Sequence, residues 1–499
     1  MTAYLLVAFS ILACALRVSS YLQPVPIDIA IYAVLGHEWL GGRVLYVNLW
    51  DNKPPLIYWV YALSEKLMGY GPLAIYGLNC VCAVLVLWGV YAATRRITRL
   101  RVPALVAAGL WVAVSGDLRL EAQFPNAEAL MNACLVWAFY FMVRLHQEDR
   151  CRDAALAGLF IGLAALLKHV VVIVLALWGL SHIFCSSRAQ VRRRIATAAL
   201  AAATASVGWV CLLGYYRFFG PWEDFLAAVF RFNTKYVSLT GSTGSHLLQA
   251  ISPRFLLHVF HPYTLVPIFL LGIGTGLGFA LSSHRRSSLR ALFVSFALGT
   301  HLMVALPGRF YAHYYQLWLP LLCIGMGVAL HIVFSYTFSR LQKSTAVLMA
   351  LTLGSLLFYE GSFLRLSPEQ ASLISFGPRY LLDRAFGEHL GRLLRPEETF
   401  FHFGHEASLY FYSRRKLPTE LAGITALYVG SPNDVAALRL RVQYALEASR
   451  PALWVTLPYL YDDARHLPFS PFLWTAYHQV PALSAGTAFI VFARRPVKT

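Results

Sequence analysis

The stretch PLAIYGLNCVCAVLVLWGVYAATRRITRLR at residues 72–101 joins an apolar run, residues 72–93, to a cluster of arginines. A hydrocarbon core of about 30 Å needs about twenty apolar residues in a helix, so the run predicts a membrane span. The arginines predict that the C-terminal end of this span faces the cytoplasm, because cytoplasmic connections are enriched in Lys and Arg. The sequence therefore predicts a protein that crosses a bilayer.

Ten further apolar stretches predict spans of the same kind. They lie at residues 3–20, 102–116, 126–145, 154–168, 169–186, 196–215, 256–281, 291–306, 314–335 and 344–360. The predicted fold class is a polytopic α-helical membrane protein with about eleven transmembrane helices.

Basic residues gather in every second connection between these spans, which sets the expected orientation. The clusters are Arg95, Arg96, Arg99 and Arg101; Arg144, Arg150 and Arg152; Arg188, Arg192, Arg193 and Arg194; Arg285, Arg286 and Arg290; Arg340 and Lys343. This alternation predicts a cytoplasmic N-terminus and, with an odd number of spans, a C-terminus outside the cytoplasm. A bacterial inner (plasma) membrane, with the C-terminal end in the periplasm, is the natural compartment.

The composition agrees with a lipid environment. Hydrophobic residues make up 58% of the chain and charged residues 13%, and the mean hydropathy is +0.57. The formal net charge of +18 could indicate nucleic-acid binding, but the basic residues lie in short clusters between apolar stretches. We therefore expect no nucleic-acid partner. The eight cysteines show no disulfide framework.

The chain divides at about residue 360. Residues 1–360 predict a membrane domain with two long outward loops, 19–71 and 216–255, and long loops are often functional. From 361 to 499 charged residues are frequent and apolar runs are short. This part predicts a small α/β domain outside the cytoplasm, with helices at 378–395 and 433–448 and strands at 399–404, 426–430, 453–457 and 489–492.

Two charged residues of the first outward loop are candidates for chemistry. Asp28 lies near the outer end of the first span, where a carboxylate is costly unless it is paired or hydrated. The alternative is that Asp28 caps a helix. Lys53 precedes Pro54 and Pro55, which fix the backbone and suit a positioned cation. The alternative is a lysine that snorkels to the interface.

Several motifs occur in an order that resembles a known family, the GT-C glycosyltransferases of the protein O-mannosyltransferase and lipid A aminoarabinose transferase group. The motifs are Asp28 with Tyr32 one turn on, Gly-x-x-Leu-Tyr at 42–46, Trp-Asp-x-Lys-Pro-Pro at 50–55, Asn-Ala-Glu at 126–128, Leu-Leu-Lys at 166–168, and Arg-Phe-Tyr-Ala-His-Tyr-Tyr at 309–315 before Leu319-Pro320. They extend over the whole membrane region. Many relatives have a glutamate after the first aspartate, where this chain has Ile29, which weakens the transfer of protein mannosylation in particular.

The resemblance implies an inverting glycosyltransferase that moves a sugar from a polyprenyl-phosphate donor to a hydroxyl acceptor on a lipid, a glycan or a protein. Such a reaction belongs to the cell envelope, with lipopolysaccharide biosynthesis as one setting. Asp28 would be the general base, since a carboxylate within reach of the acceptor hydroxyl can take its proton. Lys53 matches the family lysine that contacts the donor phosphate, whose charge grows as it leaves.

Further residues of the same motifs complete the predicted site. Lys168, Arg309 and His313 are expected at the donor phosphate, although Lys168 could equally reach the headgroups from a turn between two spans. Glu128 could orient the acceptor or hold a lysine, or it could be a first-turn glutamate favoured by the helix dipole. The remaining expected donor or acceptor contacts are Tyr32, Tyr46, Asn126 and Tyr314. No metal-ligand cluster is visible, so no cofactor is predicted, and a divalent metal stays open because some distant relatives use one.

Two other classes of function were weighed. A multi-span transporter would show inverted repeats or a matched pair of broken helices, and charges near the midplane rather than at the outer boundary. A polysaccharide polymerase or ligase would share the lipid-linked substrate but would favour a large outer loop late in the chain.

The glycines at 272, 274, 276 and 278 resemble a nucleotide-binding fingerprint, but they lie inside an apolar span and predict close helix packing instead.

Overall fold

The computed structural model describes residues 1–496 apart from 186–187, 253–264, 282–286, 336–339 and 465. The described chain is mostly helical and divides into two compact units, which we describe separately. The first unit consists of Met1–Tyr21, Tyr76–Gly214 and Gly241–Ser367, and the second of Leu22–Ile75, Tyr215–Thr240 and Pro368–Thr499.

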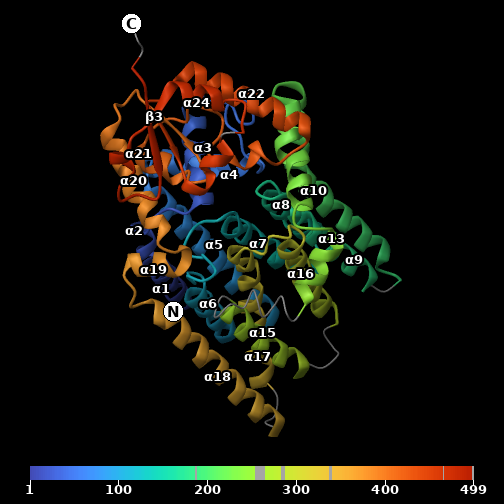
Figure 1. Ribbon diagram of the computed structural model, residues 1–499. Helices are drawn as coiled ribbons and strands as arrows, with labels where there is room; N and C mark the ends of the chain where they lie inside the picture. Colours follow the sequence, from blue (N-terminus) through green and yellow to red (C-terminus); the bar gives the residue numbers. More distant parts are fainter. Residues whose placement is uncertain (186–187, 253–264, 282–286, 336–339, 465, 497–499) are drawn as a thin grey trace. The chain divides into compact units, whose positions relative to one another are not determined.

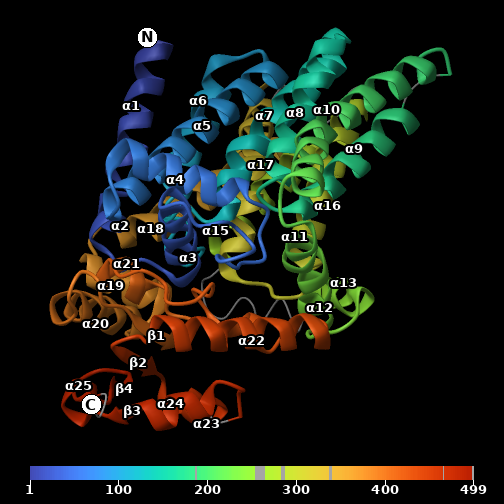
Figure 2. The same ribbon diagram turned by 90° about the horizontal axis from the view of Figure 1, so that it is seen from above.

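The first unit is built from apolar helices that pack in pairs. Helix α7 packs on α8, α9 on α16, and α15 on α17, as Figures 1 and 2 let the reader follow. Its helices are α1 (Thr2–Ala15), α2 (Val18–Leu22), α5 (Pro72–Thr98), α6 (Arg101–Val114), α7 (Ala127–Glu148), α8 (Cys151–Ala165), η1 (His169–Val171), α9 (Val172–Phe184), α10 (Val191–Phe218), α13 (Thr243–Ile251), α15 (Val266–Leu281), α16 (Ser287–Ala305), η5 (Ala312–Trp318), α17 (Leu319–Ser335) and α18 (Arg340–Phe363).

A helix lies at each of the eleven positions predicted to span the membrane, and the chain is a polytopic helical membrane protein. The first predicted span is divided into α1 and α2, and residues 256–264 of the eighth lie outside the described residues. Among the described residues, six helices are long and apolar enough to cross a bilayer, and four shorter apolar helices accompany them. Since helices of 10–17 residues are short for a core of about 30 Å, the count of eleven crossings stays a prediction.

The glycine run of α15 allows the close helix packing that the sequence predicts. A Cβ atom at Gly274 would overlap Met326 of α17, and one at Gly278 would overlap Ala329. At Gly272 and Gly276, one helix face away, an added Cβ would meet nothing within 4 Å. The Met326 side chain could move away from a Cβ atom at Gly274, but the overlap at Gly278 includes the backbone of Ala329, so packing requires a glycine at Gly278, as expected for small residues at a membrane helix interface.

Arg17 lies between α1 and α2 and is buried, with 1% of its surface exposed. Its guanidinium donates to the carbonyl of Ala13 at 2.7 Å and to the carbonyl of Ser115, which follows α6. A buried guanidinium that lacked hydrogen-bond acceptors would cost much free energy. These carbonyl oxygens lower that cost by accepting its hydrogen bonds. This contact joins the broken first span to the end of a helix that lies 98 residues further along the chain.

The two long loops of the sequence contain helices, and most of the first loop and the start of the second fold with the C-terminal residues in the second unit. Helices α3 (Ile27–Leu40) and α4 (Leu56–Met68) come from the first loop. The second loop forms α11 (Trp222–Leu226), a π-helical segment η2 (Ala227–Phe232) and α12 (Asn233–Ser238). These helices were not expected from the sequence. The domain boundary at residue 360 stays a prediction, since the contacts group 22–75 and 215–240 with 368–499.

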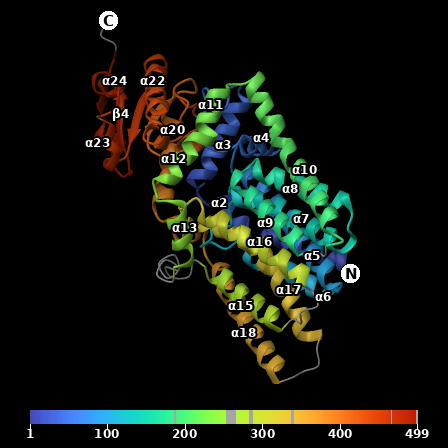
Figure 3. The same cartoon turned by 90° about the vertical axis from the view of Figure 1, so that its right-hand side faces the viewer.

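A four-stranded mixed sheet forms the centre of the C-terminal part. Its strands β1 (Phe400–Phe403), β2 (Leu453–Thr456), β3 (Tyr477–Gln479) and β4 (Ile490–Arg494) lie in the order β1-β2-β4-β3, and only the β1–β2 pair is parallel. Figure 3 shows α22 and α24 near these strands. The helical segments are α19 (Pro368–Phe376), α20 (Arg379–Leu393), α21 (Ser408–Ser413), η6 (Ile424–Leu427), α22 (Pro432–Ser449), η7 (Pro458–Leu460), α23 (Tyr461–Ala464), α24 (Ser470–Ala476) and α25 (Pro481–Ser484).

Three predicted strands and both predicted helices of this part are found where the sequence placed them. The strand expected at 426–430 is wrong, because that stretch holds the end of the 3₁₀ helix η6 and a turn. A short buried apolar run does not distinguish a strand from a helical turn. Strand β3 was not predicted, because only Tyr477 of its three residues is buried and the apolar pattern is too weak.

Candidate active site

Lys53 and Tyr32, two predicted site residues, lie together in the second unit. The Lys53 ammonium is 5.8 Å from the centroid of the Tyr32 ring and donates a hydrogen bond to Asn52 Oδ1 at 2.9 Å. Tyr32 is buried and packs edge-on against Tyr58 and Tyr61, at centroid distances of 6.3 and 5.6 Å. A cation over an aromatic face is stabilised by the ring quadrupole. The ammonium is thus held against a ring that cannot move freely.

Asp28 lies in the first turn of α3, four residues before Tyr32. Residues four apart on a helix share a face, so Asp28 lies on the same face of α3 as Tyr32, whose ring the Lys53 ammonium approaches. The N-cap of α3 is Pro26, which has extended backbone angles, so Asp28 is not the cap that the sequence analysis weighed as an alternative. A half-buried carboxylate in the first turn is favoured by the helix dipole. Asp28 and Tyr32 are therefore one turn apart on α3, and Lys53 reaches the Tyr32 ring from the segment between α3 and α4.

Buried tyrosines hold Lys53 and the nearby Asp51. The Tyr46 hydroxyl donates to the Lys53 carbonyl at 2.7 Å, and the Tyr58 hydroxyl donates to Asp51 Oδ2 at 2.7 Å. Both tyrosines are fully buried, and burial raises the pKa of each well above its usual value, so both remain hydrogen-bond donors at neutral pH. Tyr46 was predicted as a donor or acceptor contact. Its observed role is to hold the residue that carries the ammonium.

Asn52 is clamped by Asn233, which the sequence analysis did not single out. Asn52 Nδ2 donates to Asn233 Oδ1 at 2.9 Å, and Asn233 Nδ2 donates to the Asn52 carbonyl at 2.8 Å and to the Val229 carbonyl at 2.8 Å. Asn233 follows the π-helical segment η2, and such segments are frequent at functional sites. The partners lie 181 residues apart, so no local pattern could have revealed this pair.

A second group of predicted residues comes together in the first unit. Lys168 Nζ lies 2.8 Å from Glu128 Oε1 and 3.8 Å from the centroid of the Tyr314 ring. Glu128 is 2% exposed, and the Lys168 side chain is 17% exposed. Glu128 therefore holds a lysine, one of the two functional alternatives, and it also lies in the first turn of α7, where the helix dipole favours an acid.

His313 extends this group through Glu121. His313 Nδ1 is 3.0 Å from Glu121 Oε2, and Asn126 Nδ2 donates to the Glu121 carbonyl at 3.2 Å. Glu121 has a φ of 53°, in the left-handed region that costs energy for a residue with a side chain. Arg309 is half-buried in the loop before η5, and its predicted contact with a donor phosphate is not tested by the fold.

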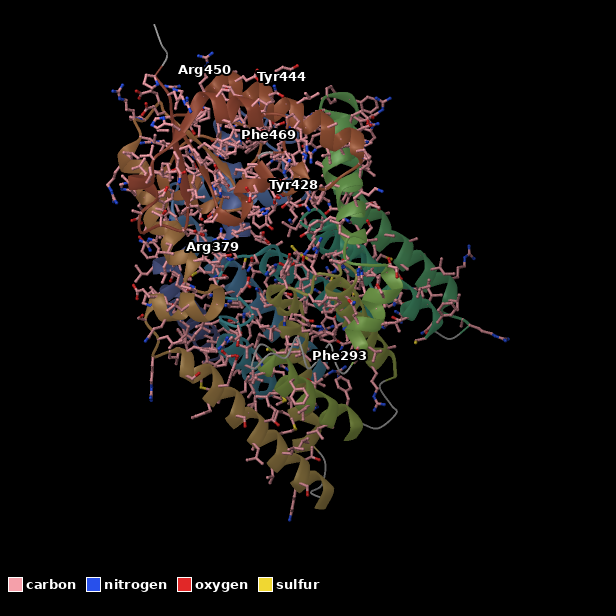
Figure 4. All side chains as sticks on the ribbon, in the orientation of Figure 1. Phe293, Arg379, Tyr428, Tyr444, Arg450 and Phe469 are labelled. Carbon is pink, nitrogen blue, oxygen red and sulfur yellow. The ribbon has the colours of Figure 1, made fainter. Side chains whose placement is uncertain are left out.

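A third polar cluster lies within the C-terminal part. His402 Nε2 is 2.7 Å from Glu406 Oε2, and Arg379, labelled in Figure 4, forms an ion pair with the same glutamate. Burial would raise the pKa of Glu406, but His402 and Arg379 outweigh it and lower that pKa to about 2. Burial raises the pKa of the neighbouring Asp383 to about 7, with the charge of Glu406 adding to the effect. The internal pairing indicates a structural network.

No metal centre can be built from the described residues. No group of three or more His, Cys, Asp or Glu side chains among them is placed to hold a metal ion.

Comparison with known families identifies one match in sequence. The family of dolichyl-phosphate-mannose-protein mannosyltransferases matches residues 52–211, a range that begins in the Lys53 motif and includes Glu128 and Lys168. No curated protein sequence matches the chain.

Solved structures match over nearly the whole chain. ArnT from Cupriavidus metallidurans, bound to undecaprenyl phosphate, is 16% identical with a TM-score of 0.63, covering 99% of this chain and 98% of that one. The Archaeoglobus fulgidus oligosaccharyltransferase is 13% identical with a TM-score of 0.52, covering 100% and 75%. The mycobacterial arabinofuranosyltransferase AftD is 13% identical with a TM-score of 0.54, covering 99% and 40%. At these identities the likeness shows the fold.

Proposed function

We propose that this chain, which has the GT-C fold and resembles the aminoarabinose transferase and protein mannosyltransferase group, is a membrane glycosyltransferase that moves a sugar from a polyprenyl-phosphate donor to a hydroxyl acceptor. The observation that carries the proposal is the contact of the Lys53 ammonium with the ring of Tyr32, which lies one turn from Asp28 on α3, since the reaction needs one base and one cation. A solved structure of the same fold binds undecaprenyl phosphate, and this supports a lipid-linked donor.

The proposed reaction is a single displacement with inversion at the anomeric carbon. The acceptor oxygen forms a bond to that carbon while its proton passes to the Asp28 carboxylate. The bond between the anomeric carbon and the phosphate oxygen breaks, and the electron pair leaves with the polyprenyl phosphate. Lys53 offsets the negative charge that grows on this oxygen, and the hydrogen bonds to Asn52 and from Tyr46 fix its position before the reaction starts.

The predicted ligands of the first unit keep their proposed roles. Lys168, Arg309 and His313 would contact the donor phosphate, and Asn126, Glu128 and Tyr314 would contact donor or acceptor. Because Glu128 already neutralises much of the Lys168 charge at 2.8 Å, a phosphate would have to share this ammonium. We therefore expect Lys168 to contribute less to donor binding than Lys53, whose hydrogen bond is to an uncharged amide.

The proposed setting is the inner membrane of a bacterium, with eleven crossings, a cytoplasmic N-terminus and the C-terminal part in the periplasm. The arginine clusters in every second connection support this orientation. The acceptor would be a lipid, a glycan or a protein that reaches the outer leaflet, where polyprenyl-phosphate sugars are consumed.

Transfer of labelled sugar tests this proposal. Membranes with equal amounts of wild type, Asp28→Asn or Lys53→Ala are given a polyprenyl-phosphate sugar, and labelled product is counted. We expect Asp28→Asn to lower kcat by about 10²–10⁴, the usual contribution of a general base, and Lys53→Ala to lower kcat and donor affinity together. Lys66→Ala, which changes an exposed lysine of α4, should retain full activity.

The outcome separates the candidate functions. Full activity of Asp28→Asn would contradict the assignment of the base, whatever the effect at Lys53. Absence of donor consumption by wild type, together with uptake of a solute into vesicles, would favour the transporter. Growth of a polymer on the lipid carrier would favour a polymerase or ligase instead of a single transfer.

A further inference from the structure

A cavity of about 150 Å³ lies within the second unit, next to the Lys53 motif in the chain. Its walls come from three segments: the first outward loop, the second outward loop and residues 426–441. Trp50 in one wall stands three residues before Lys53, and Phe232 in another stands directly before Asn233, which clamps Asn52. Neither the family match nor the motifs assign a function to this pocket.

Two aromatic side chains form a fixed apolar wall of the pocket. The rings of Trp50 and Phe232 meet edge-to-face with their centroids 4.9 Å apart, and Phe232 is 4% exposed. The Trp50 backbone N–H donates to the Glu420 carbonyl at 2.7 Å, which holds the residue in place. Trp50 itself is half-buried, so part of its ring is open to the pocket. A flat, held aromatic surface suits the apolar face of a ring-shaped ligand.

Charged side chains form another wall of the pocket, and they are paired with one another. Arg231 contacts Asp434 through two hydrogen bonds, Nε to Oδ2 at 3.2 Å and Nη2 to Oδ1 at 3.1 Å, and reaches Glu223 at 3.2 Å. Arg441 donates to Asp224 at 2.9 Å and to Glu420 at 3.0 Å. Each carboxylate can accept about four hydrogen bonds, so acceptor sites remain for hydroxyl groups.

The charge of the pocket disfavours an anion. Three carboxylates, Glu223, Asp224 and Asp434, line it against two guanidiniums, a balance of −1 in a chain whose net charge is +18. The guanidiniums are already occupied by these acids. A phosphate would meet excess negative charge, whereas a neutral polyol or an amine would not.

The volume limits the ligand to one ring. A cavity of about 150 Å³ is known to hold a single six-membered carbon ring such as benzene. An aromatic wall, several carboxylate acceptors, no excess of positive charge and room for one ring together describe a site for a sugar. We propose that this pocket binds one uncharged or amino-bearing monosaccharide unit of the acceptor, with Trp50 against its ring and the carboxylates accepting hydrogen bonds from its hydroxyls. The assignment of this sugar to the acceptor rests on the proposed function, whereas the binding of a sugar in the pocket does not.

Direct binding of small sugars to the full-length protein in detergent tests the pocket without any transfer reaction. Saturation-transfer NMR is recorded with methyl β-glucoside, glucosamine and glucose 6-phosphate as probes. We expect glucosamine and methyl glucoside to bind at millimolar concentration and glucose 6-phosphate to bind at least fivefold more weakly. Trp50→Ala should weaken binding at least fivefold, and Trp50→Phe should recover much of it.

A second variant guards against a folding defect at Trp50. Ala437 lines the pocket from an exposed position on α22, so Ala437→Met would fill the space while all the ion pairs remain. This variant should also lose binding. Trp39→Ala, which removes an exposed tryptophan of α3 outside the pocket, should bind sugars as wild type does.

The results have distinct meanings. Tightest binding of glucose 6-phosphate, unchanged binding in both pocket variants, or binding of a threonine-containing peptide but of no sugar would each overturn the proposal. Sugar binding that depends on Trp50 and Ala437, in a protein that never transfers a labelled sugar, would leave the pocket standing and contradict the proposed enzyme. Transfer activity in a protein that binds no sugar would contradict the pocket and leave the proposed enzyme standing.

Discussion

Lys53 shows how single residues prepare a charge for chemistry. Its side chain bonds to Asn52, its carbonyl accepts from Tyr46, and Pro54 and Pro55 follow it and restrict the backbone. The free-energy cost of ordering the ammonium is therefore offset during folding, before the donor binds. Asn233 belongs to this arrangement because it holds the amide of Asn52.

We predict that Asn233 acts as a positioning residue for Lys53. Asn233→Ala leaves the Asn52 amide free to turn, and a lost hydrogen bond of about 1 kcal/mol corresponds to a roughly fivefold change in rate. Asn52→Ala should have a larger effect, since it removes the bond to the ammonium itself. The measurement is kcat and the donor KM in the transfer assay, and both variants should raise KM for the donor and leave KM for the acceptor unchanged.

The neighbouring Thr234 offers the control. Its hydroxyl bonds to the Phe230 carbonyl and it is exposed, so Thr234→Val changes the same segment without touching Asn52. Equal losses in Thr234→Val and Asn233→Ala would mean that the segment, and not the amide, matters. Asn233→Ala with unchanged donor KM would contradict the positioning role.

The site residues that the sequence could predict are those in local motifs. Asp28, Lys53 and Tyr32 fall within short, ordered patterns, and the fold brings Lys53 and Tyr32 together. Asn233 and Glu121 had no such pattern, because their partners lie 181 and 192 residues away. A contact across such a separation is decided by packing, which a single sequence does not show.

At the scale of elements, long apolar helices were predictable and short elements were not. The helix α22 was expected from its long helical stretch, and in the structure Ser431 caps it, accepting from the Asp434 N–H at 3.2 Å. The outward helices α3 and α4 were not expected, since their apolar residues were assigned to loop. Strand β3 has only three residues, and its pairing with β4 depends on neighbours far along the chain.

Helix α20 carries a prediction about pH. Asp383 is 1% exposed, and burial raises its pKa from about 3.8 to about 7. The folded state therefore holds this proton more tightly than the unfolded state does, and stability falls as pH rises from about 4 to about 7. Asp383→Asn removes the free-energy cost of ionising this buried carboxyl group in the folded state. It should stabilise the protein by about 1 kcal/mol at pH 5 and by a few kcal/mol at pH 8.

Thermal unfolding of wild type and Asp383→Asn in detergent between pH 4 and 8 measures this difference. The gain in Tm should widen with pH and level off above pH 7. Asp463→Asn changes an exposed acid of α23 and should show no such trend. A gain that is the same at pH 5 and pH 8 would mean that Asp383 is ionised throughout this range.

At the scale of the whole molecule, the orientation in the membrane can be tested with cysteines that the chain already has. Cys151 is exposed and lies between Arg150 and Arg152, in a connection expected on the cytoplasmic side. A variant that keeps only Cys151 should react with a membrane-impermeant maleimide only after the cells are permeabilised. A cysteine-free variant with Glu397→Cys, at an exposed position of the C-terminal part, should react in spheroplasts without permeabilisation.

The two cysteines must react from opposite sides of the membrane for the predicted orientation to hold. The opposite pattern would reverse the chain in the membrane, and labelling of both sites from the same side would require an even number of crossings between them. Either result would move the Lys53 motif or the C-terminal sheet away from the side where polyprenyl-phosphate sugars are used.

The buried Arg17 has a consequence for how the protein is made. Its partner at Ser115 is 98 residues further along the chain, and ribosomes add about 5–20 residues per second. For roughly 5–20 s after synthesis of the first helix, this guanidinium has the carbonyl of Ala13 but lacks that of Ser115. The nascent first helix is therefore expected to wait at the translocon or the headgroup layer and to settle only when α6 arrives.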